Sequence, residues 1–169
     1  MAKLNVVKAC RKAQGICGKC MTEIKVGDGY VWWQFYQGPL MRRCTKPECQ
    51  PDRKELVSSA FERSRMELEE RLAAITEPWD VDDIIADIEA LKDECESSLD
   101  NMPEGLRESS DSGVLLQERM DALETWAEEL GSAKDEAEGG WDGEEGSTES
   151  VAEQQAELLQ AIKDVCYGG

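Results

Sequence analysis

The spacing of the hydrophobic residues changes near residue 52. Before that point, the segment at residues 21–36 has the residue types of β-strands, among them Ile24, Val26, Val31 and the aromatic residues of 30–36. Gly27, Asp28 and Gly29 divide this segment and have the composition of a tight turn, so we expect two strands joined there. The second strand would place Val31, Trp33 and Phe35 on one face and Tyr30, Trp32, Gln34 and Tyr36 on the other. So small a ribbon can bury only one of these faces by itself.

After Pro51 the apolar residues recur at intervals of three and four, which predicts amphipathic helices. The most regular stripe consists of Val81, Ile84, Ile88, Leu91, Cys95, Leu99 and Met102. Three expected helices begin with the spacing of a capping box, at Asp52 and Glu55, Asp80 and Asp83, and Ser150 and Glu153. Another helix, after a linker at residues 104–113, is expected to end at Gly131 and carries Leu116, Met120, Leu123, Trp126 and Leu130 on one face.

Four cysteines flank the predicted strands in two close pairs. Cys17 and Cys20 form a C-x₂-C pair, and Cys44 and Cys49 form a C-x₄-C pair. Both separations are typical of structural zinc sites, in which each pair supplies two corners of a tetrahedron. We therefore expect one structural Zn²⁺ on these four thiolates. Cys10 could replace one of them, although its separation from Cys17 favours a free thiol.

Two further cysteines, Cys95 and Cys166, lie on apolar faces of the predicted helices, where buried free cysteine is common. The patterns together predict an α+β protein in four parts. These are a zinc-binding module with a β-hairpin (residues 1–51), an acidic region of three helices in a bundle or coiled coil (52–131), a flexible acidic, Gly-rich linker (132–149) and a C-terminal helix (150–169).

Charge is divided unevenly along the chain, whose net charge is −18. Residues 1–55 contain 11 basic and 5 acidic side chains, whereas residues 56–169 contain 8 basic and 32 acidic ones. The N-terminal part is therefore basic, with a balance of +6, and the helical part has a balance of −24. The two parts should bind different partners or each other.

The residue inventory argues against catalysis. The chain has no histidine, and it has no phosphate-binding loop and no nucleophile-elbow motif. A site made of four cysteines also leaves no open metal position, so we expect the protein not to be an enzyme. No signal segment opens the sequence and no apolar run approaches 18 residues. We therefore expect a cytoplasmic protein that is not secreted and has no membrane partner.

Several runs of residues carry a family resemblance. Cys-Gly-Lys-Cys-x₃-Ile-x₂-Gly-x₂-Tyr, from Cys17 to Tyr30, followed by a distant cysteine pair, resembles treble-clef and zinc-ribbon modules. The runs at residues 30–36, 42–44, 55–59, 101–106 and 116–126 resemble small phage-encoded proteins of uncharacterised function. The first resemblance implies a knuckle and hairpin followed by ligands near a helix start. The second implies a phage origin and the cytoplasm of a bacterial host, and it implies no activity.

Three functions are compatible with these features. The first is a zinc-stabilised protein-interaction module, with a host or phage protein bound through Trp32, Tyr36, Arg42 and Arg43. The second is an acidic mimic of nucleic acid that blocks a DNA- or RNA-binding enzyme. The third is nucleic-acid binding through the zinc module, which the acidic helices disfavour. The stripe at residues 81–102 faces helices of the same chain or, in a homo-oligomer, a second copy. Apolar positions elsewhere in the chain favour the former.

Overall fold

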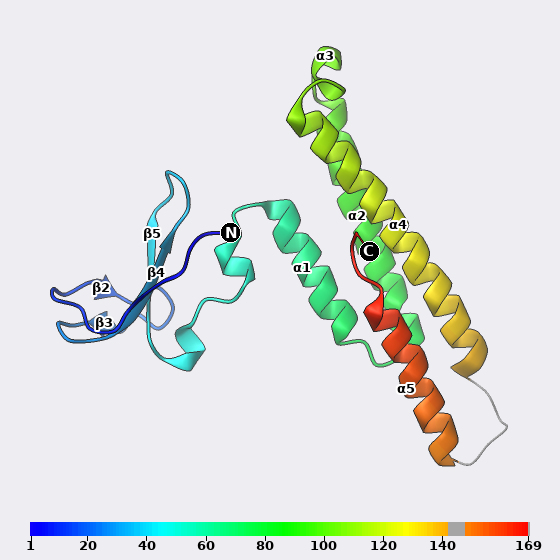
Figure 1. Ribbon diagram of the computed structural model, residues 1–169, viewed down its shortest axis with the longest axis horizontal. Helices are drawn as coiled ribbons and strands as arrows, with labels where there is room; N and C mark the ends of the chain where they lie inside the picture. Colours follow the sequence, from blue (N-terminus) through cyan, green and yellow to red (C-terminus); the bar gives the residue numbers. More distant parts are fainter. Residues whose placement is uncertain (142–147, 169) are drawn as a thin grey trace. The chain divides into compact units, whose positions relative to one another are not determined.

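The computed structural model divides the chain into two compact units, Met1–Arg63 and Ser64–Gly169, and describes residues 1–141 and 148–168. We call them the N-terminal unit and the helical unit. All strands of the described residues belong to the N-terminal unit, and the helical unit consists of helices and their connections (Figure 1). The predicted α+β class is confirmed. The division between the units falls inside helix α1 (Ala60–Ala73).

Five short strands form two antiparallel sheets in the N-terminal unit. The strands are β1 (Asn5–Val7), β2 (Gly15–Ile16), β3 (Glu23–Ile24), β4 (Tyr30–Gln34) and β5 (Leu40–Cys44). Three of them form a sheet in the order β1-β4-β5, and β2 pairs with β3. Val31 and Trp33 on one face of β4 are buried, whereas Tyr30 and Trp32 on the other face are only half-buried. The predicted two-faced pattern of this strand is therefore confirmed.

The expected hairpin around Gly27–Gly29 is wrong, because β3 and β4 belong to different sheets. The backbone of the turn bonds to an earlier part of the chain instead. The N–H of Gly27 donates to the Cys10 carbonyl, and the N–H of Cys10 donates to the Asp28 carbonyl, both at 2.9 Å. A Cβ at Gly29 would lie 3.0 Å from the Lys8 carbonyl oxygen, so glycine permits this close approach.

The capping box of Asp52 and Glu55 is present, but it opens a single turn. The Glu55 N–H donates to Asp52 Oδ1 (2.8 Å), and the Asp52 N–H donates to Glu55 Oε2 (3.2 Å). These bonds enclose the 3₁₀ turn η2 (Lys54–Leu56), which follows a similar turn, η1 (Pro47–Cys49). Helix α1 starts later than predicted, at Ala60.

The helical unit is built on two adjacent antiparallel helices. Besides the C-terminal part of α1 it contains η3 (Pro78–Asp80), α2 (Val81–Asp100), α3 (Glu104–Arg107), α4 (Asp111–Trp141) and α5 (Thr148–Asp164). Helix α4 packs against both α2 and α5 (Figure 1). The ion pairs Lys134–Asp82 (2.6 Å) and Lys92–Glu124 (3.0 Å) join α2 to α4 in the antiparallel sense.

The core of the helical unit follows the predicted stripes. Buried residues include Ile84, Ile88, Leu91 and Cys95 of α2, Leu123, Trp126 and Leu130 of α4, and Ile162 of α5. The stripe of α2 is therefore covered by helices of the same chain. None of the helices in the described residues combines the length and apolar character that a bilayer span requires.

Several predicted helix ends are wrong. The capping box expected at Asp80 begins three residues earlier, because Asp80 occupies the fourth position (N3) of a box that begins at Glu77. The expected linker at residues 104–113 contains α3 and the start of α4. Helix α4 does not stop at Gly131, so residues 132–141 of the predicted flexible linker are helical. Helix α5 begins two residues before Ser150, and residues 142–147 of that linker lie outside the described residues.

Candidate metal centre

Two segments of the N-terminal unit bring four thiols together. Cys17 and Cys20 follow β2, Cys44 is the last residue of β5, and Cys49 ends η1. Their Sγ atoms all lie within 4.8 Å of one another, and the Sγ atoms of Cys20 and Cys44 are 3.6 Å apart. Tetrahedral Zn²⁺ with Zn–S bonds of about 2.3 Å places neighbouring sulfurs about 3.8 Å apart. The four predicted ligands therefore form a cluster of the size that one metal ion needs.

The first pair of thiols is carried by a tight turn that is bonded to β5. The Cys17 N–H donates to the Thr22 carbonyl (2.8 Å), and the Met21 N–H donates to the Cys17 carbonyl (3.0 Å). Met21 has a φ of 58°, the left-handed conformation that closes such a turn. The Gly18 N–H donates to the Arg42 carbonyl (2.9 Å). This last bond holds the turn against β5, and so brings the first pair to Cys44.

The second pair is held by Gln50, a residue that the sequence analysis did not single out. Its side-chain amide donates to the carbonyl of Cys44 (3.1 Å) and to that of Lys46 (3.3 Å). The Cys49 N–H also donates to the Lys46 carbonyl (2.9 Å). Pro47 is the first residue of η1, a position where the fixed φ of proline suits the start of a helical turn. These bonds turn the chain so that Cys49 faces the other three thiols. No spacing rule would have identified Gln50.

The four sulfurs have very different proton affinities when no cation is present. The hydroxyl and N–H of Thr22 lower the pKa of Cys20 to about 6. Burial, together with the neighbouring thiols, raises the pKa of Cys49 to about 12. Burial raises the pKa of Cys44, and it also opposes ionisation of Cys17, whose pKa is nevertheless lowered by backbone N–H groups. All four can be thiolates together only beside a cation, and a bound divalent metal supplies that charge.

The remaining cysteines lie outside this cluster. Cys10 is 5% exposed, and its thiol donates to the Lys25 carbonyl (2.8 Å) while it packs with Cys17, Cys49 and Ile24. It therefore forms part of the small core beside the metal site, and the four-sulfur cluster does not include it. In the helical unit Cys95 is buried as predicted, but Cys166 is exposed because it follows the last residue of α5.

The four residues predicted to bind a partner lie in different environments. Trp32 and Arg42 are cross-strand neighbours in the β4–β5 register, and both are half-buried. Tyr36 lies in the turn between these strands and is 93% exposed. Arg43 is only 7% exposed, so it is not available as a surface residue. The structure therefore contradicts the prediction for Arg43.

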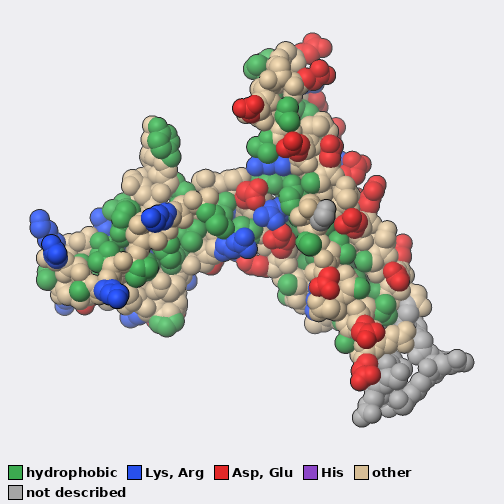
Figure 2. All heavy atoms as spheres, in the orientation of Figure 1, with side chains coloured by type: hydrophobic (Ala, Val, Ile, Leu, Met, Phe, Trp, Pro, Cys, Tyr) green, Lys and Arg blue, Asp and Glu red, His purple; other side chains and the backbone are tan. Residues whose placement is uncertain are grey.

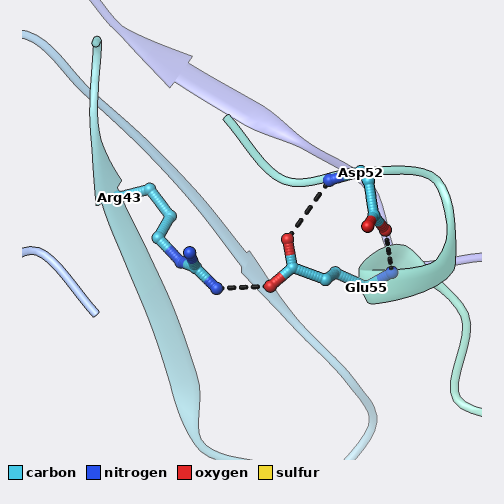
Figure 3. Close-up of polar contacts among 3 residues, drawn as sticks. All are labelled: Arg43, Asp52 and Glu55. Atoms are coloured by element: carbon cyan, nitrogen blue, oxygen red, sulfur yellow. Dashed lines mark hydrogen bonds and ion pairs between the residues drawn. The ribbon is translucent and has the colours of Figure 1, made fainter. Parts of the chain in front are cut away.

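Arg43 instead joins β5 to the segment that follows Cys49. Its guanidinium forms an ion pair with Glu55 (Figure 3). It also lies 5.7 Å from the centre of the Trp33 ring. Glu55 is fixed in turn by its hydrogen bonds with Asp52. The pairing of Arg43 with Glu55 has no signal in the sequence, because the two residues are brought together only by the fold.

We compared the chain with models of protein families, with curated proteins and with solved structures, and none of these comparisons gave a match. The geometry of the site therefore has to carry the functional argument. A cluster of four cysteines near the N-terminus can hold a metal ion, and four sulfur ligands would complete a tetrahedral shell. Such a shell leaves no position for water or a substrate, which is the arrangement of structural zinc sites.

Proposed function

We propose that the N-terminal unit is a zinc-stabilised module that binds another protein. The observation that carries the metal-binding part of this proposal is the cluster of four Sγ atoms within 4.8 Å of one another. The metal would have a structural role, because it would cross-link two segments of a unit with a small apolar core. We propose no catalytic role for the protein, since four thiolates fill the metal shell and the chain has no histidine.

The less buried side of the three-stranded sheet supports the binding role. Trp32 and Arg42 lie side by side across β4 and β5, and Tyr36 extends from the turn between these strands. Aromatic and arginine side chains contribute most of the binding energy in many protein interfaces. We therefore assign partner binding to these three residues. The partner would be a bacterial or phage protein in the host cytoplasm, if the resemblance to phage proteins reflects the origin of the chain.

A second candidate function is supported by the charge of the helical unit. Residues 56–169 have a balance of −24, and Figure 2 shows acidic side chains spread over the visible face of this unit. A surface of this kind can imitate a phosphate backbone and occupy a nucleic-acid-binding protein. In that case binding would rest on many screened contacts, and no single side chain would dominate it.

The two candidates predict different outcomes of one affinity experiment. Wild-type protein, Trp32→Ala, and a variant with Glu89, Asp93 and Glu96 changed to Gln or Asn are immobilised and exposed to a nuclease-treated bacterial lysate. Retained proteins are quantified by mass spectrometry at 0.1 and 0.5 M salt, where the Debye length falls from about 10 Å to less than half of that. We expect a specific partner that Trp32→Ala releases and the carboxylate variant keeps. A partner that still binds Trp32→Ala, but is released at 0.5 M salt and does not bind the carboxylate variant, would contradict the proposal and support mimicry.

A further inference from the structure

The corner of the helical unit where α2 ends and α4 begins carries apolar side chains that the core does not use. Leu106, Val114 and Leu115 are 49%, 46% and 44% exposed. Val114 and the half-buried Leu99 contribute the apolar lining of a groove of about 450 Å³. The other lining residues are Arg107, Glu108, Gln117, Glu118 and Asp121. We call this feature the corner groove.

The corner groove is held in shape by close packing between the backbones of α3 and α4. Gly113 is buried, and a Cβ at this position would collide with the Arg107 carbonyl and lie 2.9 Å from the Leu106 carbonyl oxygen. The backbone of α3 therefore packs directly on the first turn of α4. The Ser110 hydroxyl donates to the Leu106 carbonyl (2.6 Å) and accepts the N–H of Gly113 (3.1 Å). These contacts hold Leu106 and Val114 at the surface.

The charge of the corner groove is negative. Its lining includes three carboxylates, from Glu108, Glu118 and Asp121, and one cation, Arg107. The guanidinium of Arg107 is already occupied at the end of α2, where it donates to the carbonyls of Asp100 (2.7 Å) and Met102 (3.2 Å). It also lies 3.4 Å from the Asp100 carboxylate. Residues 99–121 as a whole contain six carboxylates and two arginines, so the surface favours a cationic partner.

We infer that the corner groove binds a basic amphipathic helix of another protein. Such a helix would place apolar side chains on Leu99 and Val114 and its Lys or Arg side chains beside Glu108, Glu118 and Asp121. A nucleic acid would bring phosphates to these carboxylates, and the helical unit of a second copy would bring a charge balance of −24. This site belongs to the helical unit, so it is independent of the surface proposed for the N-terminal unit.

The inference can be tested with a defined probe and the full-length protein. The probe is a fluorescein-labelled 18-residue Leu/Lys peptide whose leucines share one helical face, and its control has the same composition in a scrambled order. Binding is measured by fluorescence anisotropy for wild type, Val114→Asp and Glu118→Gln. Matched controls are Val26→Asp, an exposed valine in the N-terminal unit, and Glu129→Gln, an exposed glutamate of α4 outside the groove.

We expect the amphipathic peptide to bind more tightly than the scrambled one. Val114→Asp should weaken binding by about tenfold, because it places a charge in the apolar contact. Glu118→Gln should weaken it by about two- to fivefold, and the matched controls should have no effect. Equal binding of both peptides, or equal loss in all variants, would show non-specific attraction and overturn the inference. A dimer in light scattering that Val114→Asp dissociates would assign the groove to a second copy and overturn it as well.

Discussion

At the scale of single residues, the metal site depends on groups that control the ionisation and position of the thiols. Thr22 stabilises the Cys20 thiolate, and Gln50 fixes the loop between Cys44 and Cys49. Metal binding requires all four thiols to lose their protons, which couples the stability of the N-terminal unit to pH. The unfolded chain binds more protons than the zinc-bound one below the ordinary thiol pKa of about 8.5, so stability should rise with pH up to that value.

Proton release measures this coupling directly. We expect about four protons to leave for each Zn²⁺ bound at pH 7, because the proposed coupling of metal binding to folding leaves the metal-free unit unfolded, with ordinary thiol pKa values. The number is obtained by calorimetry in buffers of different ionisation enthalpy. A folded metal-free site would already hold the Cys20 thiolate, whose pKa is lowered to about 6. A release of about three protons or fewer would therefore contradict the coupling of metal binding to folding.

Arg43 provides a second prediction at this scale. Arg43→Met should destabilise the zinc-bound N-terminal unit by about 1–2 kcal/mol, because it removes the buried charged partner of Glu55, whose side chain is 34% exposed. Hydrogen–deuterium exchange of residues 30–57 should show the loss. Arg42→Met is the matched control, since Arg42 is half-buried in the neighbouring position of β5. Equal protection in both variants would show that the Arg43–Glu55 pair does not stabilise the unit.

At the scale of secondary structure, substitutions of two glycines of α4 test whether the helix continues through Gly131 and packs against α3 at Gly113. Gly131 lies inside the helix with nothing within 4 Å of an added Cβ, so Gly131→Ala should stabilise the helical unit by about 0.5–1 kcal/mol. Gly113→Ala should destabilise it by about 1–3 kcal/mol, because the new Cβ meets the backbone of α3. Urea unfolding followed by circular dichroism checks both. A destabilising Gly131→Ala would favour the helix end that the sequence predicted.

The helix ends illustrate what could and could not be predicted from sequence. The buried face of α2 was predicted correctly, because the apolar residues recur at the helical period on the face that packs into the core. Gly131 looked like a stop signal, but the buried residues Leu130 and Ala137 on either side of it pack α4 and override a propensity of about 1 kcal/mol. Strand partners were mispredicted because they depend on distant hydrogen bonds, such as those between Cys10 and the turn at Gly27.

The candidate site shows the same contrast. The prediction that the four cysteines lie close together is confirmed, because the short spacing within each pair is a local feature of the sequence. Arg43 was misassigned because a basic residue beside aromatic ones looks like a surface contact, and its partner Glu55 is 12 residues away. Thr22 and Gln50 were not considered because they act on the thiols and the loop rather than on the metal. Residues that support ligands are difficult to recognise without the fold.

At the scale of the whole molecule, each unit has its own source of stability. The helical unit has an apolar core across α2, α4 and α5. We expect the N-terminal unit to depend on the proposed metal. Removal of zinc with a chelator should therefore unfold the N-terminal unit and leave most of the helical circular dichroism at 222 nm. The reason is that almost all of the helix lies after residue 63.

The converse variant provides the control. Ile88→Asp puts a charge into the core of the helical unit, where Ile88 is 1% exposed. It should lower the free energy of unfolding of this unit by about 3–5 kcal/mol. Zinc content should be unchanged by this variant, while helical circular dichroism falls. Loss of zinc in Ile88→Asp, or loss of the helices on chelation, would show that the two units fold as one.

The central claim is that four named thiols hold one zinc ion, and metal analysis of freshly purified protein tests it most directly. We expect about one equivalent of Zn²⁺ per chain in the wild type and in Cys10→Ser. Cys17→Ser and Cys49→Ser should bind much less, because each removes one corner of the tetrahedron. Less than about half an equivalent in the wild type, or a loss in Cys10→Ser equal to that in Cys49→Ser, would contradict the assignment.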